Sequence, residues 1–127
     1  KGSGMIEPDM ATMLSFVFTD SKIPSNILQK LLAASNKKSF NSITVDSDTS
    51  TSDTCLLFAT GQARNTTINS AADPALKEFK AALDQVMQSL AHQIVRDGEG
   101  ATKFVAVTVE GAENNKAARR IALSVAN

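Results

Sequence analysis

The longest amphipathic segment constrains the fold of this chain most. Residues 72–98 read ADPALKEFKAALDQVMQSLAHQIVRDG. Their large apolar residues recur at spacings of mostly three and four: Leu76, Phe79, Leu83, Val86, Met87, Leu90 and Ile94. This periodicity predicts a helix with one buried face. Asp73 can cap it, Pro74 suits its first turn, and Gly98 is placed to stop it.

Alternating segments predict the sheet on which this helix packs. Residues 12–20, TMLSFVFTD, predict a strand with one strongly buried side. One face carries Leu14, Phe16 and Phe18, and the other carries Met13, Ser15, Val17 and Thr19. Further strands are expected at 40–47, 53–61 and 102–111. In the last of these, Phe104 and either Val105 or Val107 should point inward.

Two further helices complete the order. Residues 24–35 place Ile27, Leu28, Leu31 and Leu32 on one face, and residues 114–127 predict a short helix that buries Ile121 and Val125. The order β-α-β-β-α-β-α predicts an α/β (α+β layered) fold, with helices packed on a mixed sheet.

Composition excludes several classes of partner. The 127 residues suit one domain, and 13 basic residues balance 13 acidic ones, so no bulk charge attracts nucleic acid or an anionic membrane. Trp and Tyr are absent, which removes the usual platforms for stacking bases. We find neither a signal-like pattern nor an apolar run of membrane-spanning length. We therefore expect a cytoplasmic protein that binds neither nucleic acid nor membrane.

The sequence offers weak support for a metal. One cysteine, Cys55, and one histidine cannot form a zinc site of the usual type, and the apolar run around Cys55 indicates a small buried side chain rather than a reactive thiol. The tract 45–54, VDSDTSTSDT, carries Asp46, Asp48 and Asp53. It lacks the glycine and terminal glutamate of a calcium loop, so a hydrogen-bonded turn is the better interpretation. We predict no metal.

Three other features carry candidate chemistry. In RDGEGATKF, residues 96–104, Glu99 stands between two glycines. This is not a phosphate loop, because no glycine precedes the lysine and the order is helix to strand. Glu99 could grip a substrate ammonium group or simply occupy a solvated turn. Lys1, in KGSGM, could meet a substrate carboxylate or remain solvent-exposed and idle.

The Ala11–Thr12 bond is the third feature. A threonine can simply start a strand, because its β-branched side chain suits one. Alternatively, its hydroxyl attacks the Ala11 carbonyl, so that the peptide bond becomes an ester that water cleaves. The freed α-amino group, whose ordinary pKa is about 7.7–8.0, could then act as general base for the hydroxyl.

The combination and order of KGSGMIEPDMATMLSFVFTD, VDSDTSTSDT and LAHQIVRDGEGATKFVAVTVEGA resemble the ornithine acetyltransferase family, the bifunctional glutamate N-acetyltransferases of arginine biosynthesis. The resemblance covers essentially the whole chain. It implies part of an N-terminal-nucleophile-like ornithine acetyltransferase/aminopeptidase fold. Residues 1–11 would end an α subunit, and residues 12–127 would begin the β-subunit domain.

The resemblance implies autoproteolysis at Ala11–Thr12 and a ping-pong acetyl transfer. N-acetylornithine would acetylate Thr12, ornithine would leave, and glutamate would accept the acetyl group. Lys1, Thr12 and Glu99 fall on substrate-binding positions. No metal or cofactor is implied, although acetyl-CoA is an acetyl donor in the bifunctional members. The expected partners are the remaining α and β segments, in an αβ heterodimer that pairs further into a heterotetramer.

Three departures from the family pattern keep alternatives open. The oxyanion-hole threonine and glycine and the C-terminal DPNWGR-type stretch of the family are absent from the chain, and Ser47 stands where many members have glycine. One alternative is an N-terminal-nucleophile aminopeptidase or amidase that uses the same Thr12. The other is an inactive structural fragment that lacks the oxyanion-hole segment.

Overall fold

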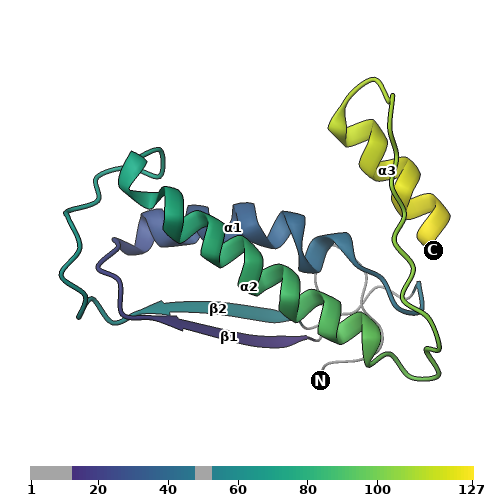
Figure 1. Cartoon of the computed structure of the whole chain (residues 1–127), viewed down its shortest axis with the longest axis horizontal. Helices are drawn as coiled ribbons and strands as arrows, with labels where there is room; N and C mark the ends of the chain where they lie inside the picture. Colours follow the sequence, from purple (N-terminus) through teal and green to yellow (C-terminus); the bar gives the residue numbers. More distant parts are fainter. Residues whose placement is uncertain (1–12, 48–52) are drawn as a thin grey trace.

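Two parallel strands lie under two helices in the computed structural model, which describes residues 13–47 and 53–127. The elements are β1 (Leu14–Thr19), α1 (Ser25–Lys38), the 3-10 turn η1 (Phe40–Ser42), β2 (Thr54–Ala59), the 3-10 turn η2 (Pro74–Leu76), α2 (Lys77–Arg96) and α3 (Asn115–Ala126). Figure 1 shows α1 and α2 on the same side of the strands. The α/β class, with helices layered on a sheet, is confirmed.

The connection from β1 to β2 follows from their parallel pairing. Parallel strands need a long crossover, and α1 supplies it. The register runs from Leu14 opposite Thr54 to Thr19 opposite Ala59. Met13 is almost fully buried, and its carbonyl accepts a hydrogen bond of 2.5 Å from the Thr54 N–H. This bond and this burial hold Met13 in place where the chain enters β1.

The core lies between the helices and the inner face of the sheet. The four apolar residues expected on one face of α1 are all buried, as the sequence predicted. Leu83 and Met87 of α2 are buried as well, and Met87 has no exposed surface. Val86 was expected on the same buried face but is 45% exposed, because it lies toward the edge of the packed stripe.

The buried side of β1 is the less apolar one. Ser15 is buried and Val17 packs against the core, whereas Leu14, Phe16 and Phe18 are 55%, 51% and 69% exposed. Alternation in the sequence identifies the two faces of a strand. It does not tell which face meets the helices.

Two expected strands are absent from the described residues. Residues 40–47 begin with η1 and continue without a ladder, and residues 102–111 run without strand pairing. A strand needs a hydrogen-bonded neighbour, and among the described residues only β1 and β2 provide one for each other. The prediction of four strands was therefore wrong for this structure.

The C-terminal segment also differs from expectation. Ile121 and Val125 of α3 are 47% and 68% exposed, and Phe104 and Val105 are 41% and 72% exposed. Figure 1 shows α3 standing apart from α1 and α2. No residue of α3 is buried, so its amphipathic pattern is only partly covered within the described structure.

Asp73 forms a cap, as expected, but the backbone that it caps belongs to the 3-10 turn η2 rather than to the α-helix. The Asp73 carboxylate accepts a hydrogen bond of 3.0 Å from the Ala75 N–H, and Pro74 opens η2, which leads directly into α2. The cap thus satisfies the backbone of the short 3-10 turn before the α-helix begins.

The turn that follows η1 contains a left-handed residue. Ser47, at a position where many members of the family it resembles have glycine, has a φ of +65°. Its N–H donates to the Thr44 hydroxyl at 3.3 Å, and its own hydroxyl donates to the Asn127 carbonyl at 2.7 Å. The backbone conformation that favours glycine is therefore kept, with a serine in place.

This geometry predicts a stability difference between two Ser47 variants. Both Ser47→Gly and Ser47→Ala lose the hydroxyl, but only alanine keeps a Cβ in the left-handed region. We expect Ser47→Gly to exceed Ser47→Ala in free energy of unfolding by about 0.5–1 kcal/mol, after the entropy of glycine is subtracted. Urea unfolding of the two variants measures this difference. Equal stabilities would contradict the assigned backbone conformation.

Candidate functional site

Glu99 lies at the apex of a tight turn that follows α2. The Ala101 N–H donates to the Gly98 carbonyl at 2.9 Å, which closes a four-residue turn. Gly100, its third residue, has a φ of +72°, whereas Glu99 itself has no positive φ. This is the pattern of a type II turn, in which glycine is favoured at the third position. The Glu99 side chain is exposed, as the flanking glycines predicted.

Gly98 is needed for close packing, whereas its position after the apolar stripe had predicted that it ends the helix. Its φ is not left-handed, and α2 already ends at Arg96. Gly98 is buried, and a Cβ at this position would lie 2.8 Å from Cγ1 of Val45. Close approach of the segment that contains Val45, rather than helix termination, therefore explains this glycine.

The Glu99 turn and the start of the sheet lie at the same end of the molecule. In Figure 1, α2 ends where β1 and β2 begin, and α1 also ends there. Met13, which directly follows Thr12 in the chain, is fixed at this end by its burial and by its bond to Thr54. Lys1, Ala11 and Thr12 themselves lie outside the described residues.

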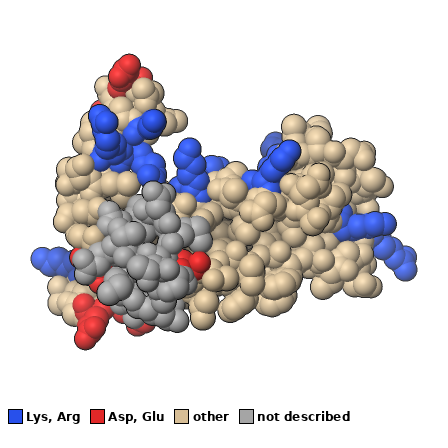
Figure 2. All heavy atoms as spheres, turned by 180° about the vertical axis from the view of Figure 1, so that it is seen from behind, with Lys and Arg blue, Asp and Glu red and all other residues tan. Residues whose placement is uncertain are grey.

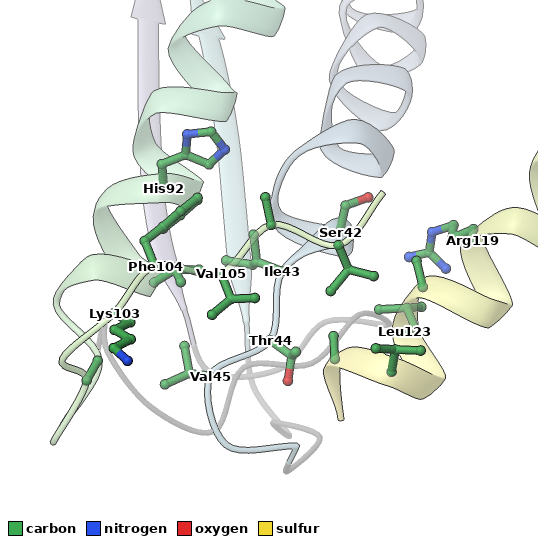
Figure 3. A pocket seen from close by; sticks show the side chains of 17 residues that line it. Ser42, Ile43, Thr44, Val45, His92, Lys103, Phe104, Val105, Arg119 and Leu123 are labelled. Carbon is green, nitrogen blue, oxygen red and sulfur yellow. The ribbon is translucent and has the colours of Figure 1, made fainter. Parts of the chain in front are cut away.

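A groove of about 640 Å³ opens beside this end of the molecule. Figure 3 shows that its walls come from the segment after η1, the end of α2, residues 101–107 and α3. Its polar groups belong to Ser42, Thr44, His92, Lys103 and Arg119, among apolar residues such as Val105 and Leu123. Glu99 is not among the residues that line it, and the sequence had not singled out this groove.

Ring contacts attach one wall of the groove to α2. The His92 ring meets the Phe104 ring edge-on with centroids 5.0 Å apart, and the Arg96 guanidinium lies 5.0 Å from the same centroid. On the opposite wall, Arg119 of α3 donates to the carbonyl of Asn41. The groove thus offers cationic side chains beside apolar surface, a lining suited to an amphiphilic or anionic group.

Cys55 behaves as a structural thiol. It lies half-buried on the helix-facing side of β2, where burial raises its pKa and the neighbouring Ser15 side chain opposes part of that shift. Its thiolate population is therefore small near neutral pH. This agrees with its predicted role as a packed side chain.

The described residues offer no support for metal binding or a membrane span. Across 13–47 and 53–127, no cluster of three or more His, Cys, Asp or Glu side chains could hold a metal ion. Asp48 lies outside the described residues, so the expected turn at 45–54 is seen only in part. No helix within the same ranges is long and apolar enough to cross a membrane.

Comparison with known proteins gives a family match over the entire chain. The model of the ArgJ family matches residues 1–127. The arginine biosynthesis bifunctional protein ArgJ of Rhizobium meliloti (strain 1021) is 63% identical, covering 100% of this chain and 32% of the relative. The protein of the same name from Gluconobacter oxydans (strain 621H) is 59% identical, covering 100% of this chain and 30% of the relative.

A solved structure agrees in fold. The crystal structure of arginine biosynthesis bifunctional protein argJ from Bacillus halodurans matches with a TM-score of 0.84 and 46% identity, over 90% of this chain and 53% of that one. The present chain spans about a third of the length of the curated relatives it matches. The match over every residue and the agreement in fold lead to one assignment: this chain belongs to the ArgJ family.

Proposed function

We propose that the full-length protein is a bifunctional acetyltransferase of arginine biosynthesis, which moves acetyl from N-acetylornithine to glutamate through an ester on Thr12. The match to the ArgJ family over residues 1–127 carries this proposal. The relatives are named arginine biosynthesis bifunctional proteins, in keeping with two activities in one pathway. The protein would work in the cytoplasm, with acetyl-CoA as a second acetyl donor.

Activation would begin with cleavage of the Ala11–Thr12 bond. The Thr12 hydroxyl attacks the Ala11 carbonyl, the amide nitrogen leaves as the Thr12 amine, and water hydrolyses the resulting ester. Thr12 then carries both a hydroxyl nucleophile and a neighbouring amine base. Residues 1–11 would end an α subunit and residues 12–127 would begin a β subunit, which pair as an αβ heterodimer and then as a heterotetramer.

The lengths of the relatives support this division. The matched region fills 53% of the solved Bacillus halodurans chain but only 30–32% of the curated relatives. The solved chain is therefore shorter than those relatives. Division of family members into two chains would produce this difference.

Acetyl transfer would then proceed in two steps. The Thr12 hydroxyl attacks the acetyl carbonyl of N-acetylornithine, its proton passes through the α-amine to the leaving nitrogen, and ornithine departs. The amine of glutamate attacks the acetyl ester and restores the Thr12 hydroxyl. Lys1 would bind a substrate carboxylate and Glu99 a substrate ammonium group. Glu99 is exposed and follows α2, and Figure 1 shows that α2 ends where β1 begins, which supports its part.

Cleavage predicts a sharp contrast between two Thr12 variants. In the full-length polypeptide, Thr12→Ala should stay uncut and lose at least about a thousandfold in kcat, because it lacks the nucleophile. Thr12→Ser keeps a hydroxyl and should still be cut. Gel electrophoresis and N-terminal sequencing read cleavage, and acetyl transfer to glutamate reads activity. A cut Thr12→Ala protein would contradict the proposal.

The role of Glu99 predicts an effect on substrate binding. N-acetylornithine keeps its side-chain ammonium, so Glu99→Gln should raise its KM about tenfold, the cost of weakening one charge-assisted hydrogen bond. The matched control is Asp97→Asn, an exposed carboxylate two residues away that should leave KM unchanged. Steady-state kinetics with varied N-acetylornithine measures both. An equal effect of the two substitutions would argue against a specific contact.

A further inference from the structure

The turn that carries Glu99 rests on a valine from a distant part of the chain. A Cβ on the buried Gly98 would lie 2.8 Å from Cγ1 of Val45, closer than real Cβ atoms come to other heavy atoms. The Cβ of Ala101 would lie 3.5 Å away, which is an ordinary contact distance. Figure 3 shows Val45 pointing toward the chain that carries Lys103. Val45 therefore fills the space that a side chain at position 98 would need.

Hydrogen bonds before and after Val45 hold it in this place. The Ser42 hydroxyl donates to the Lys37 carbonyl at 2.8 Å, which ties η1 to the end of α1. The Ser47 N–H donates to the Thr44 hydroxyl at 3.3 Å, so the backbone turns directly after the valine. The half-buried Val45 is thus presented by a segment that is anchored on both sides.

The Glu99 turn itself is held by few contacts of its own. Of residues 98–101, only Gly98 is buried, and a single backbone hydrogen bond of 2.9 Å, from Ala101 to Gly98, closes the turn. Exposed turns with few buried contacts open and shift at low cost in free energy. The position of the Glu99 carboxylate consequently depends on what packs beneath Gly98.

We propose that Val45 is a positioning residue for substrate binding, because its contact with Gly98 sets where the Glu99 carboxylate lies. The inference rests on the proposed function, in which Glu99 binds the substrate ammonium group. Figure 2 shows acidic side chains exposed at the end of the molecule where α2 finishes, as access of a cationic group requires. A hydrogen bond weakens when its donor and acceptor move apart, so a displaced turn binds the ammonium group less well.

Two substitutions in the full-length protein disturb this contact from opposite sides. Gly98→Ala places a methyl group against Val45, and the φ of Gly98 is not left-handed, so any effect comes from the contact. It should raise the KM for N-acetylornithine about tenfold, as expected for Glu99→Gln, with little change in kcat. Val45→Ala removes the support and should raise KM about threefold. A merely structural effect would lower kcat with the folded fraction and leave KM unchanged.

The double variant Val45→Ala/Gly98→Ala separates positioning from loss of stability. Its new methyl group takes the space that the valine leaves, and only the Val95 carbonyl, at 3.2 Å, stays close. We expect KM to fall below that of Gly98→Ala, to within about threefold of the unmodified protein, whereas independent effects would add. A KM as high as that of Gly98→Ala alone would overturn the proposal.

Val86→Ala is the matched control for the loss of a valine side chain. Val86 is 45% exposed and lies within α2, well before that helix ends at Arg96. The substitution removes the same atoms as Val45→Ala and should leave KM unchanged. An equal rise in KM for the two valine variants would count against a specific role for Val45.

Amide hydrogen exchange of the Ala101 N–H reads the packing without substrate. Exchange should be at least about tenfold faster in Gly98→Ala and slow again in the double variant, because this N–H closes the turn. Unchanged exchange in Gly98→Ala would overturn the proposal.

The two readouts also separate failure of this inference from failure of the proposed function. If exchange follows the expected pattern but Glu99→Gln leaves KM unchanged, the ammonium contact of the proposed function is wrong, and the positioning role is lost with it. If Glu99→Gln raises KM while Gly98→Ala does not, the ammonium contact stands and the role of Val45 alone is refuted.

Discussion

The packing of α1 and α2 on a single face of the parallel β1–β2 pair is the contact on which the rest of the structure depends. Met87 is fully enclosed in this layer, and Met13 is buried where the chain enters β1. Since the strands are parallel, α1 must cross from one end of the sheet to the other. The same packing brings the end of α2 to the start of the strands. The Glu99 turn and the residue that follows Thr12 consequently share one end of the molecule.

At the end of the molecule that holds the Glu99 turn, backbone conformation and close packing matter as much as the side chains do. Gly98 gives Val45 room to approach, and Gly100 supplies the left-handed residue of the type II turn that exposes Glu99. A second left-handed residue, Ser47, lies in the segment that contacts Gly98 through Val45. Two turns from distant parts of the chain are thus packed against each other. A change in one should shift the backbone of the other.

Periodicity was sufficient to predict α1 and α2, because an apolar stripe at helical spacing has only one way to meet a sheet. It was not sufficient for the strands. Alternation in β1 defines two faces, yet the choice between Ser15 and Phe16 as the inward residue depends on where the helices pack. Residues 102–111 have a strand-like sequence, but strand formation depends on a partner that the described residues do not supply. Ile121 and Val125 are exposed for a similar reason, because the described residues do not cover them.

Some features of the candidate site could likewise be predicted from the sequence, and others could not. Exposure of Glu99 followed from its flanking glycines. The role proposed for Thr12 comes only from the family resemblance, since an Ala-Thr pair before a strand has no distinctive local chemistry. The groove beside α3 could not be predicted, because His92, Lys103 and Arg119 come from separate elements that only the fold brings together.

Detection of an acetyl ester on Thr12 is the most direct test of the proposed chemistry. The full-length protein would be incubated with N-acetylornithine that carries an isotopically labelled acetyl group, without glutamate, and quenched in acid. We predict label on the peptide that begins at Thr12, and its loss when glutamate or hydroxylamine is added before the quench. Transfer of the label to glutamate in a protein whose Thr12 peptide never carries it would contradict a threonine-bound intermediate.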